Sequence, residues 1–285
     1  MGTLDRSYAR VSNKRFLVQS DVLLSNMFAI LKNASADVND SQTLDIFLSV
    51  PLTFSSKAFD TMVNITFASA ASVPNLNWLV PDGNGTKKRD PYAPIPANPV
   101  LESYLDRILS VYNVSDKILF LSMLEDSVDK DLNERVSGSE LALENPDFTQ
   151  GHVYDMAHFM QIVDAYEKVT LDMQVRKIPW EKLIGFTADG LDLNRISPEA
   201  LAFLAPEIPP ESIAKFTSER TQDYQSLDDL PLERETKEKL KKLKVVFYSP
   251  KVSGDILIGN GERKLHVAFM YDLGSKKVSD IEITQ

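Results

Sequence analysis

Residues 255–283 read DILIGNGERKLHVAFMYDLGSKKVSDIEI, and this stretch decides the fold class. Short runs rich in β-branched and aromatic residues, separated by turn residues, are typical of strands in an antiparallel sheet. The predicted strands are Asp255–Ile258, Lys264–Tyr271 and Lys277–Ile283, preceded by one at Lys244–Tyr248. Gly259-Asn260-Gly261 and Leu273-Gly274-Ser275 separate the last three as hairpin turns. The chain is therefore predicted to end in a small antiparallel sheet.

The beginning of the chain predicts one long amphipathic helix over residues 4–36. Phe16, Leu23, Met27 and Ile30 recur at three- and four-residue steps, and neither Gly nor Pro interrupts the pattern after Thr3. We expect Leu23, Met27 and Ile30 to face the strands.

Strand-like sequence also lies between the long helix and a largely helical middle. Leu44–Val50 and Met62–Phe67 are predicted strands, and a proline-rich linker occupies residues 81–99. Two separate domains would leave these first strands as an unsupported pair. One α+β fold with a helical domain inserted into its sheet explains the order better. The predicted parts are a body that starts with residues 1–95, an insertion over 96–243 and closing strands over 244–285.

Composition narrows the function. The 285 residues include 41 Asp and Glu against 31 Lys and Arg, for a net charge of −10, which disfavours nucleic-acid binding. The sequence has no Cys, so disulfides, thiolate metal sites and Cys nucleophiles are excluded. Phosphate loops, dinucleotide fingerprints and hydrolase or zinc-protease motifs are missing, so nothing argues for an enzyme. No apolar run reaches the roughly 18 residues of a membrane span.

Acidic residues concentrate in one part of the chain. Between positions 101 and 166 there are 13 acidic and 4 basic residues. Asp126, Asp129 and Asp131, with Glu140 nine residues further on, are the oxygen ligands that Ca²⁺ prefers. The spacing does not match an EF-hand loop. The sequence therefore predicts either a calcium site or a solvated acidic end of a helix.

Two other functions stay open at this point. Leu191 to Leu230 has the layout of a helix-hairpin-helix module, with Ser197 as a helix cap before Pro198. Its hairpin is acidic and has no Gly to present amides to phosphate, which disfavours a nucleic-acid-binding protein. A metal-dependent hydrolase could use Asp126 and Asp129 with His152 or His158, but no nucleophile or base is recognisable beside them.

Several segments, in order, resemble the K-type minor pseudopilins of type II secretion systems, the general secretion pathway protein K family. Asp126-Ser-Val-Asp129-Lys-Asp131 is similar to the family's Asp-Trp-x-Asp-x-Asp, and Gly138-Ser139-Glu140 to its Gly-Ala-Glu-Asp. Val73-Pro-Asn-Leu-Asn-Trp78 resembles its Phe-Asn-Leu-Asn segment. The stretch 191–230 resembles its C-terminal helical repeat. Ser127 replaces the usual Trp, and Leu141 replaces an acidic residue that could supply a calcium ligand.

The resemblance implies a pilin-like long helix on a sheet, with a large inserted α-domain that binds Ca²⁺ through the acidic loop. It implies a non-enzymatic protein at the tip of a periplasmic pseudopilus, in contact with two other minor pseudopilins. Secreted substrates are further candidate partners, and nucleic acid is not expected. It also implies an inner-membrane anchor upstream of Gly2, so that this chain corresponds to the periplasmic part of a protein transport component. A minor pilin of a related DNA-uptake pilus is the alternative.

Overall fold

The computed structural model describes residues 3–56, 61–81, 95–217, 223–260 and 263–284, and these divide into two compact units. The first contains residues up to Ser69 and from Pro250 onward, and the second is Ala70–Ser249. The second unit starts earlier than the expected residue 96 because Val73, Leu76 and Leu79 are buried in its core. The linker that suggested position 96 falls mostly at 82–94, outside the described residues.

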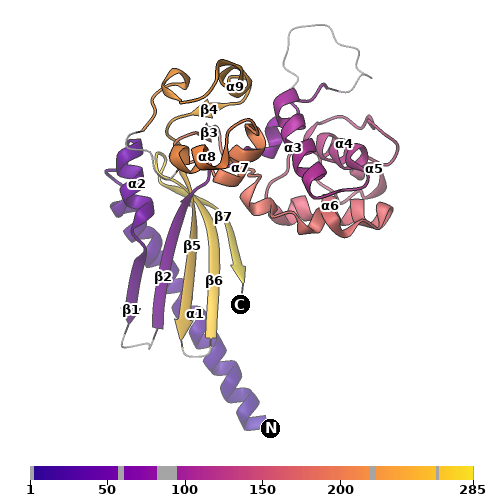
Figure 1. Cartoon of the computed structure of the whole chain (residues 1–285). Helices are drawn as coiled ribbons and strands as arrows, with labels where there is room; N and C mark the ends of the chain where they lie inside the picture. The colour runs from indigo at the N-terminus through magenta and orange to yellow at the C-terminus, as the bar shows by residue number, and fades with distance from the viewer. Residues whose placement is uncertain (1–2, 57–60, 82–94, 218–222, 261–262, 285) are drawn as a thin grey trace. The chain divides into compact units, whose positions relative to one another are not determined.

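The first unit is a five-stranded antiparallel sheet with the order β1-β2-β5-β6-β7 and the long helix α1 along it (Figure 1). Its elements are α1 (Thr3–Ala34), α2 (Ser41–Ser49), β1 (Leu52–Ser56), β2 (Thr61–Ser69), β5 (Lys251–Asn260), β6 (Arg263–Asp272) and β7 (Lys277–Thr284). Strands β2 and β5, which flank the inserted unit in sequence, are direct neighbours. The predicted α+β class is confirmed, and strands before and after the inserted unit share one sheet as predicted.

Helix α1 packs on the sheet through a stripe that differs in phase from the prediction. Met27 is buried as expected, together with Leu24 and Leu31. Leu23 is half-buried, and the prediction for Ile30 is wrong because 41% of its surface is exposed. Leu24, Met27 and Leu31 are spaced at three and four residues and form the buried stripe. Leu23 and Ile30 lie at the margin of this stripe.

The prediction of a strand at Leu44–Val50 is wrong, because this segment forms helix α2. Asp40 is its N-terminal cap. The Asp40 carboxylate accepts a hydrogen bond from the Thr43 N–H at 2.8 Å, and the Thr43 hydroxyl oxygen accepts one from the Asp40 N–H. Leu44 is fully buried and the Phe47 ring lies 4.7 Å from that of Phe67. This cap and the tertiary contact override the β propensity of the apolar run.

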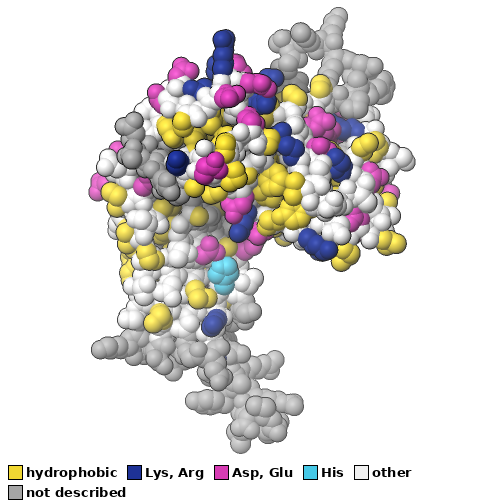
Figure 2. Space-filling model, in the orientation of Figure 1, with side chains coloured by type: hydrophobic (Ala, Val, Ile, Leu, Met, Phe, Trp, Pro, Cys, Tyr) yellow, Lys and Arg dark blue, Asp and Glu magenta, His cyan; other side chains and the backbone are white. Residues whose placement is uncertain are grey.

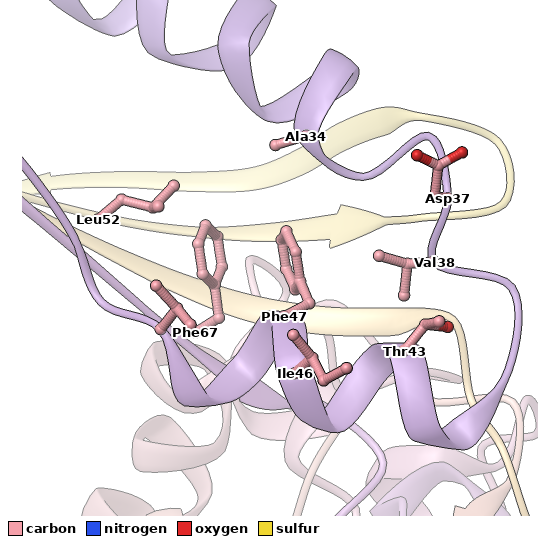
Figure 3. Close-up of a pocket in the computed structure, with 9 residues that line it drawn as sticks. Ala34, Asp37, Val38, Thr43, Ile46, Phe47, Leu52 and Phe67 are labelled. Atoms are coloured by element: carbon pink, nitrogen blue, oxygen red, sulfur yellow. The ribbon is translucent and has the colours of Figure 1, made fainter.

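An apolar groove lies between α2, the end of α1 and the sheet, with a volume of about 290 Å³ (Figure 3). Phe47 and Phe67 stand side by side in it, with Val38 and Leu52 nearby and Asp37 at its margin. The lining is mostly apolar, with Asp37 and Thr43 as its polar members. The groove therefore lacks the convergent polar groups of a catalytic site.

Gly254 in β5 leaves room for an aromatic side chain of the neighbouring strand. It pairs with Phe269 across the strands, and a side chain at this position would overlap the Phe269 ring. That ring contacts Phe28 of α1 and Phe67 of β2, with centroids 5.2 and 6.4 Å apart. The absence of a side chain at Gly254 thus allows the Phe269 ring to pack between the sheet and helix α1.

The second unit is mainly helical. Its elements are η1 (Leu76–Trp78), α3 (Pro99–Val111), α4 (Lys117–Val128), α5 (Leu141–Glu144), α6 (Met156–Thr170), η2 (Met173–Lys177), η3 (Trp180–Lys182), β3 (Leu191–Asp192), α7 (Pro198–Leu204), α8 (Pro210–Thr217), η4 (Leu227–Asp229), α9 (Arg234–Leu240) and β4 (Val245–Val246). The predicted strand Lys244–Tyr248 shortens to β4, which pairs in parallel with β3 in this unit. Its assignment to the closing sheet was wrong.

Two asparagines, the half-buried Asn77 and the buried Asn194, hold irregular segments of this unit together. Asn77 donates to the Val153 and Phe186 carbonyls and accepts from the Val153 N–H at 2.8 Å. Asn194 donates to the Phe247 and Tyr224 carbonyls and accepts from the Tyr224 N–H at 2.9 Å. An amide side chain supplies both a donor and an acceptor, so it satisfies buried backbone where no regular element does.

We expect Gly254→Ala to destabilise the protein by about 1–3 kcal/mol, because the new methyl displaces Phe269 from Phe28 and Phe67. Gly259→Ala in the same strand is the control, since among the described residues its added Cβ comes near only the Arg263 carbonyl oxygen, at 3.9 Å. Denaturant unfolding monitored by circular dichroism measures both. Equal losses in the two variants would contradict this account of Gly254.

Candidate functional site

The acidic loop begins where helix α4 ends. Asp129 is the C-terminal cap residue of α4, and Glu140 is the N-terminal cap of the short helix α5. Asp126 in the last turn of α4 is fully buried, and Asp129 and Glu140 are buried as well. Buried carboxylates require partners, so the solvated helix end expected as the alternative does not describe these three residues.

Arg135 supplies the main partner, which the sequence analysis missed. Its guanidinium pairs with Glu125 and Asp129 at 2.6 Å each, and with Asp126. Its remaining nitrogen donates to the Ile95 carbonyl at 2.7 Å. An arginine inside a run of acids was the signal in the sequence. The loop thus folds back so that one guanidinium forms ion pairs with three carboxylates.

The charge of Arg135 compensates the cluster only in part. Burial raises the pKa of Glu125 to about 7, with Arg135 opposing the shift. Burial also raises the pKa of Glu140 to about 7, and the charges of Asp126, Asp129 and Asp131 add to the effect. The pKa of Asp129 is raised by burial too. The cluster is therefore a place where added positive charge is favourable.

The four predicted ligands have different surroundings. Asp126 accepts from Arg135 and from the Ser139 hydroxyl, and Asp131 accepts from the Asn133 N–H at 2.9 Å. Glu140 accepts from Gln150 at 2.9 Å. Asp129 Oδ1 is buried and has no hydrogen-bond partner among the described residues.

As the described part of the chain stands, no three His, Asp or Glu side chains are grouped so that they could hold a metal between them. The unpartnered oxygen of Asp129 and the incomplete charge compensation nevertheless suit a hard cation. The donor chemistry fits calcium, and calcium binding stays a prediction.

The histidines of the hydrolase hypothesis have structural contacts. The His158 ring stacks on Tyr154 with centroids 5.7 Å apart and lies 4.9 Å from Phe148. Burial lowers its pKa, so the neutral form is favoured. His152 lies beside Tyr154 at 4.8 Å. These contacts place both rings in an aromatic group at the start of α6.

The helix-hairpin-helix region forms as predicted at its first helix. The Ser197 hydroxyl accepts from the Ala200 N–H at 3.0 Å, and Pro198 opens α7. Helix α8 follows with Glu211 in its first turn. On the face drawn in Figure 2, acidic and basic side chains are interspersed over the helical part of the molecule. This pattern lacks the concentrated basic field that favours nucleic-acid binding.

The geometry defines a class: a long helix on an antiparallel sheet, with a helical unit inserted between two neighbouring strands. No family model matches the sequence, and no curated protein matches it. The structure is similar to a chain in the crystal structure of the GspK-GspI-GspJ complex from the type 2 secretion system of enterotoxigenic Escherichia coli. The TM-score is 0.70 at 15% identity, over 98% of this chain and 99% of that chain. The likeness shows a shared fold that includes the inserted unit.

None of the helices in the described residues has the length and apolarity needed to cross a bilayer.

We expect Arg135→Met to destabilise the calcium-free protein by about 3–5 kcal/mol, because it leaves three buried carboxylates without their cation. Arg176→Met is the control: Arg176 also pairs with two acids, Asp164 and Glu167, but its side chain is 38% exposed. An exposed pair contributes about 1 kcal/mol or less. Urea denaturation in a chelating buffer compares the two variants, and a loss at Arg135 no larger than at Arg176 would refute the role given to Arg135.

Proposed function

We propose that this protein is a K-type minor pseudopilin, which helps to form the tip of a type II secretion pseudopilus by protein–protein contacts and catalyses no reaction. The observation that carries the proposal is the likeness over nearly the full length of both chains. A shared sheet alone would fit many pilin-like proteins. The inserted helical unit, Ala70–Ser249, matches as well, and it narrows the choice to the K type.

The proposed partners are two other minor pseudopilins. The similar structure is a complex of three such proteins, which supports this choice. The same proposal places the protein in the periplasm, held to the inner membrane by a helix upstream of Gly2. Secreted proteins are further candidate partners at the tip. A DNA-uptake pilus is the alternative setting, and saturable binding of duplex DNA at low salt would favour it.

Helix α1 offers a surface for these contacts. Val18, Val22 and Ile30 are spaced at multiples of four residues, which forms one ridge on a helix. Their exposed fractions are 58%, 56% and 41%, although all three are apolar. An exposed apolar ridge is suited to packing against helices of neighbouring subunits.

We expect Val22→Glu and Ile30→Glu to weaken assembly with the two partner pseudopilins at least about tenfold, since each places a charge in an apolar contact. The measurement is co-expression followed by size-exclusion chromatography with light scattering. Ile118→Glu is the control, because Ile118 is an apolar residue of α4 with 71% of its surface exposed. Assembly that survives both α1 changes would exclude this surface, and the absence of any complex with the unchanged chain would refute the proposed function.

We further propose that the acidic loop binds one Ca²⁺ ion, with Asp126, Asp129, Asp131 and Glu140 as the ligands expected from the sequence. The Asp129 Oδ1 atom, which is buried and has no hydrogen-bond partner among the described residues, supports the proposal. A bound Ca²⁺ supplies positive charge in a cluster where one guanidinium, that of Arg135, pairs with three carboxylates. Its effect is structural: it holds the connection between α4 and α5.

We expect chelation to lower the melting temperature, since an ion that binds only the folded state stabilises it by mass action. Asp129→Ala should abolish the difference between calcium and chelator. Mg²⁺ should substitute poorly, because it demands near-ideal octahedral geometry. Differential scanning calorimetry in each buffer checks this, and identical melts with calcium and chelator would exclude a stabilising ion.

A further inference from the structure

Gln150 lies at the meeting point of the acidic loop. Its side-chain nitrogen is 2.9 Å from Glu140 Oε2 and 3.4 Å from the Asp126 carbonyl oxygen, and it also contacts the Asp131 carbonyl oxygen. Three oxygen atoms from separate parts of the loop therefore surround one amide group. The sequence analysis did not single out Gln150, which is ten residues beyond Glu140.

The neighbouring glycine holds Gln150 in this position. Gly151 has φ of +90°, and its N–H donates to the Ser127 carbonyl at 3.0 Å. A Cβ on Gly151 would lie 3.3 Å from the Asp129 carbonyl oxygen. Only glycine adopts this conformation readily, so the chain passes directly against the end of α4.

Arg135 and Gln150 contact different oxygen atoms of the acidic loop. The Asp126 carboxylate is engaged by Arg135 and Ser139, whereas Glu140 and the carbonyls of Asp126 and Asp131 point to Gln150. Asp129 is shared: its Oδ2 pairs with Arg135, and its Oδ1 is buried without a partner among the described residues. The Glu140 carboxylate and the carbonyl oxygens of Asp126 and Asp131 thus lie on the Gln150 side, away from the guanidinium.

We propose that Gln150 is a calcium ligand through its side-chain oxygen, together with Glu140, Asp129 and the Asp131 carbonyl, while the Asp126 carboxylate stays with Arg135. This inference rests on the calcium binding proposed above and changes its ligand set. The two ends of a glutamine amide are interchangeable by a half-turn of the side chain. After that turn the group surrounded by oxygens is itself an oxygen, and amide and carbonyl oxygens are ordinary ligands of Ca²⁺.

Two substitutions separate a calcium ligand from a simple hydrogen-bond donor. Gln150→Met keeps the length of the side chain and removes both polar atoms. Gln150→Glu keeps an oxygen and removes the N–H donor. If Gln150 only donates to Glu140 and Asp131, the new carboxylate repels them and calcium affinity falls. If Gln150 is a ligand, the carboxylate binds the ion instead and affinity is kept or raised.

The experiment is isothermal titration of the whole chain with CaCl₂, with Gln161→Met as the control at an exposed position of α6. Circular dichroism and a melt in chelator establish that each variant is folded. We expect Gln150→Met to weaken calcium binding by about 10- to 100-fold, Gln150→Glu to bind at least as tightly as the unchanged chain, and Gln161→Met to have no effect.

The outcomes distinguish the two proposals. Calcium binding that is unchanged in Gln150→Met, or that is lost in Gln150→Glu, overturns the role of Gln150 and leaves the calcium site standing. An unchanged chain that binds no calcium at millimolar concentration overturns both. Neither result bears on assembly with partner pseudopilins, which the α1 variants test separately.

Discussion

The antiparallel pairing of β2 with β5 is the constraint on which the rest of the structure depends. Ser69, the last residue of β2, lies opposite Val252 near the start of β5. The chain therefore leaves the sheet and returns to it at the same end, with 180 residues in between, from Ala70 to Ser249. Closing a flexible loop of this length would cost about 5 kcal/mol in chain entropy. An insertion that folds by itself, with its ends already close, avoids most of that cost.

Asp192 holds the two ends of the inserted unit close together. Its main-chain N–H donates to the Ala71 carbonyl at 2.9 Å, and its carboxylate accepts from the Ser249 main chain. One fully buried residue thus binds the first and last turns of the insertion. Arg195 pairs with the carboxylate at 2.9 Å, although burial still raises the pKa of Asp192. A charge is tolerated there because it is paired and hydrogen-bonded.

Much of the fold could be predicted from the sequence, because hairpin turns and alternating strands are local signals. The failures have physical causes. At Leu44–Val50 the apolar run suited a strand, but the cap of Asp40 on Thr43 made it a helix. Ile30 was assigned to the core because the apolar face of α1 is wider than the part of it that the sheet covers. At the site, carboxylates are easy to recognise, whereas Arg135 and Gln150 gain their roles only when the loop folds over them.

A few polar residues hold the irregular segments of the inserted unit in place. Asn77 and Asn194, in two of the resembling segments, satisfy buried main-chain groups of distant loops. Asp126 and Glu140, in two others, anchor the loop after α4. An apolar core accepts many sequences of similar volume. A buried amide or carboxylate that must meet several fixed partners does not, so irregular segments depend on a few polar residues while the helices around them are free to differ.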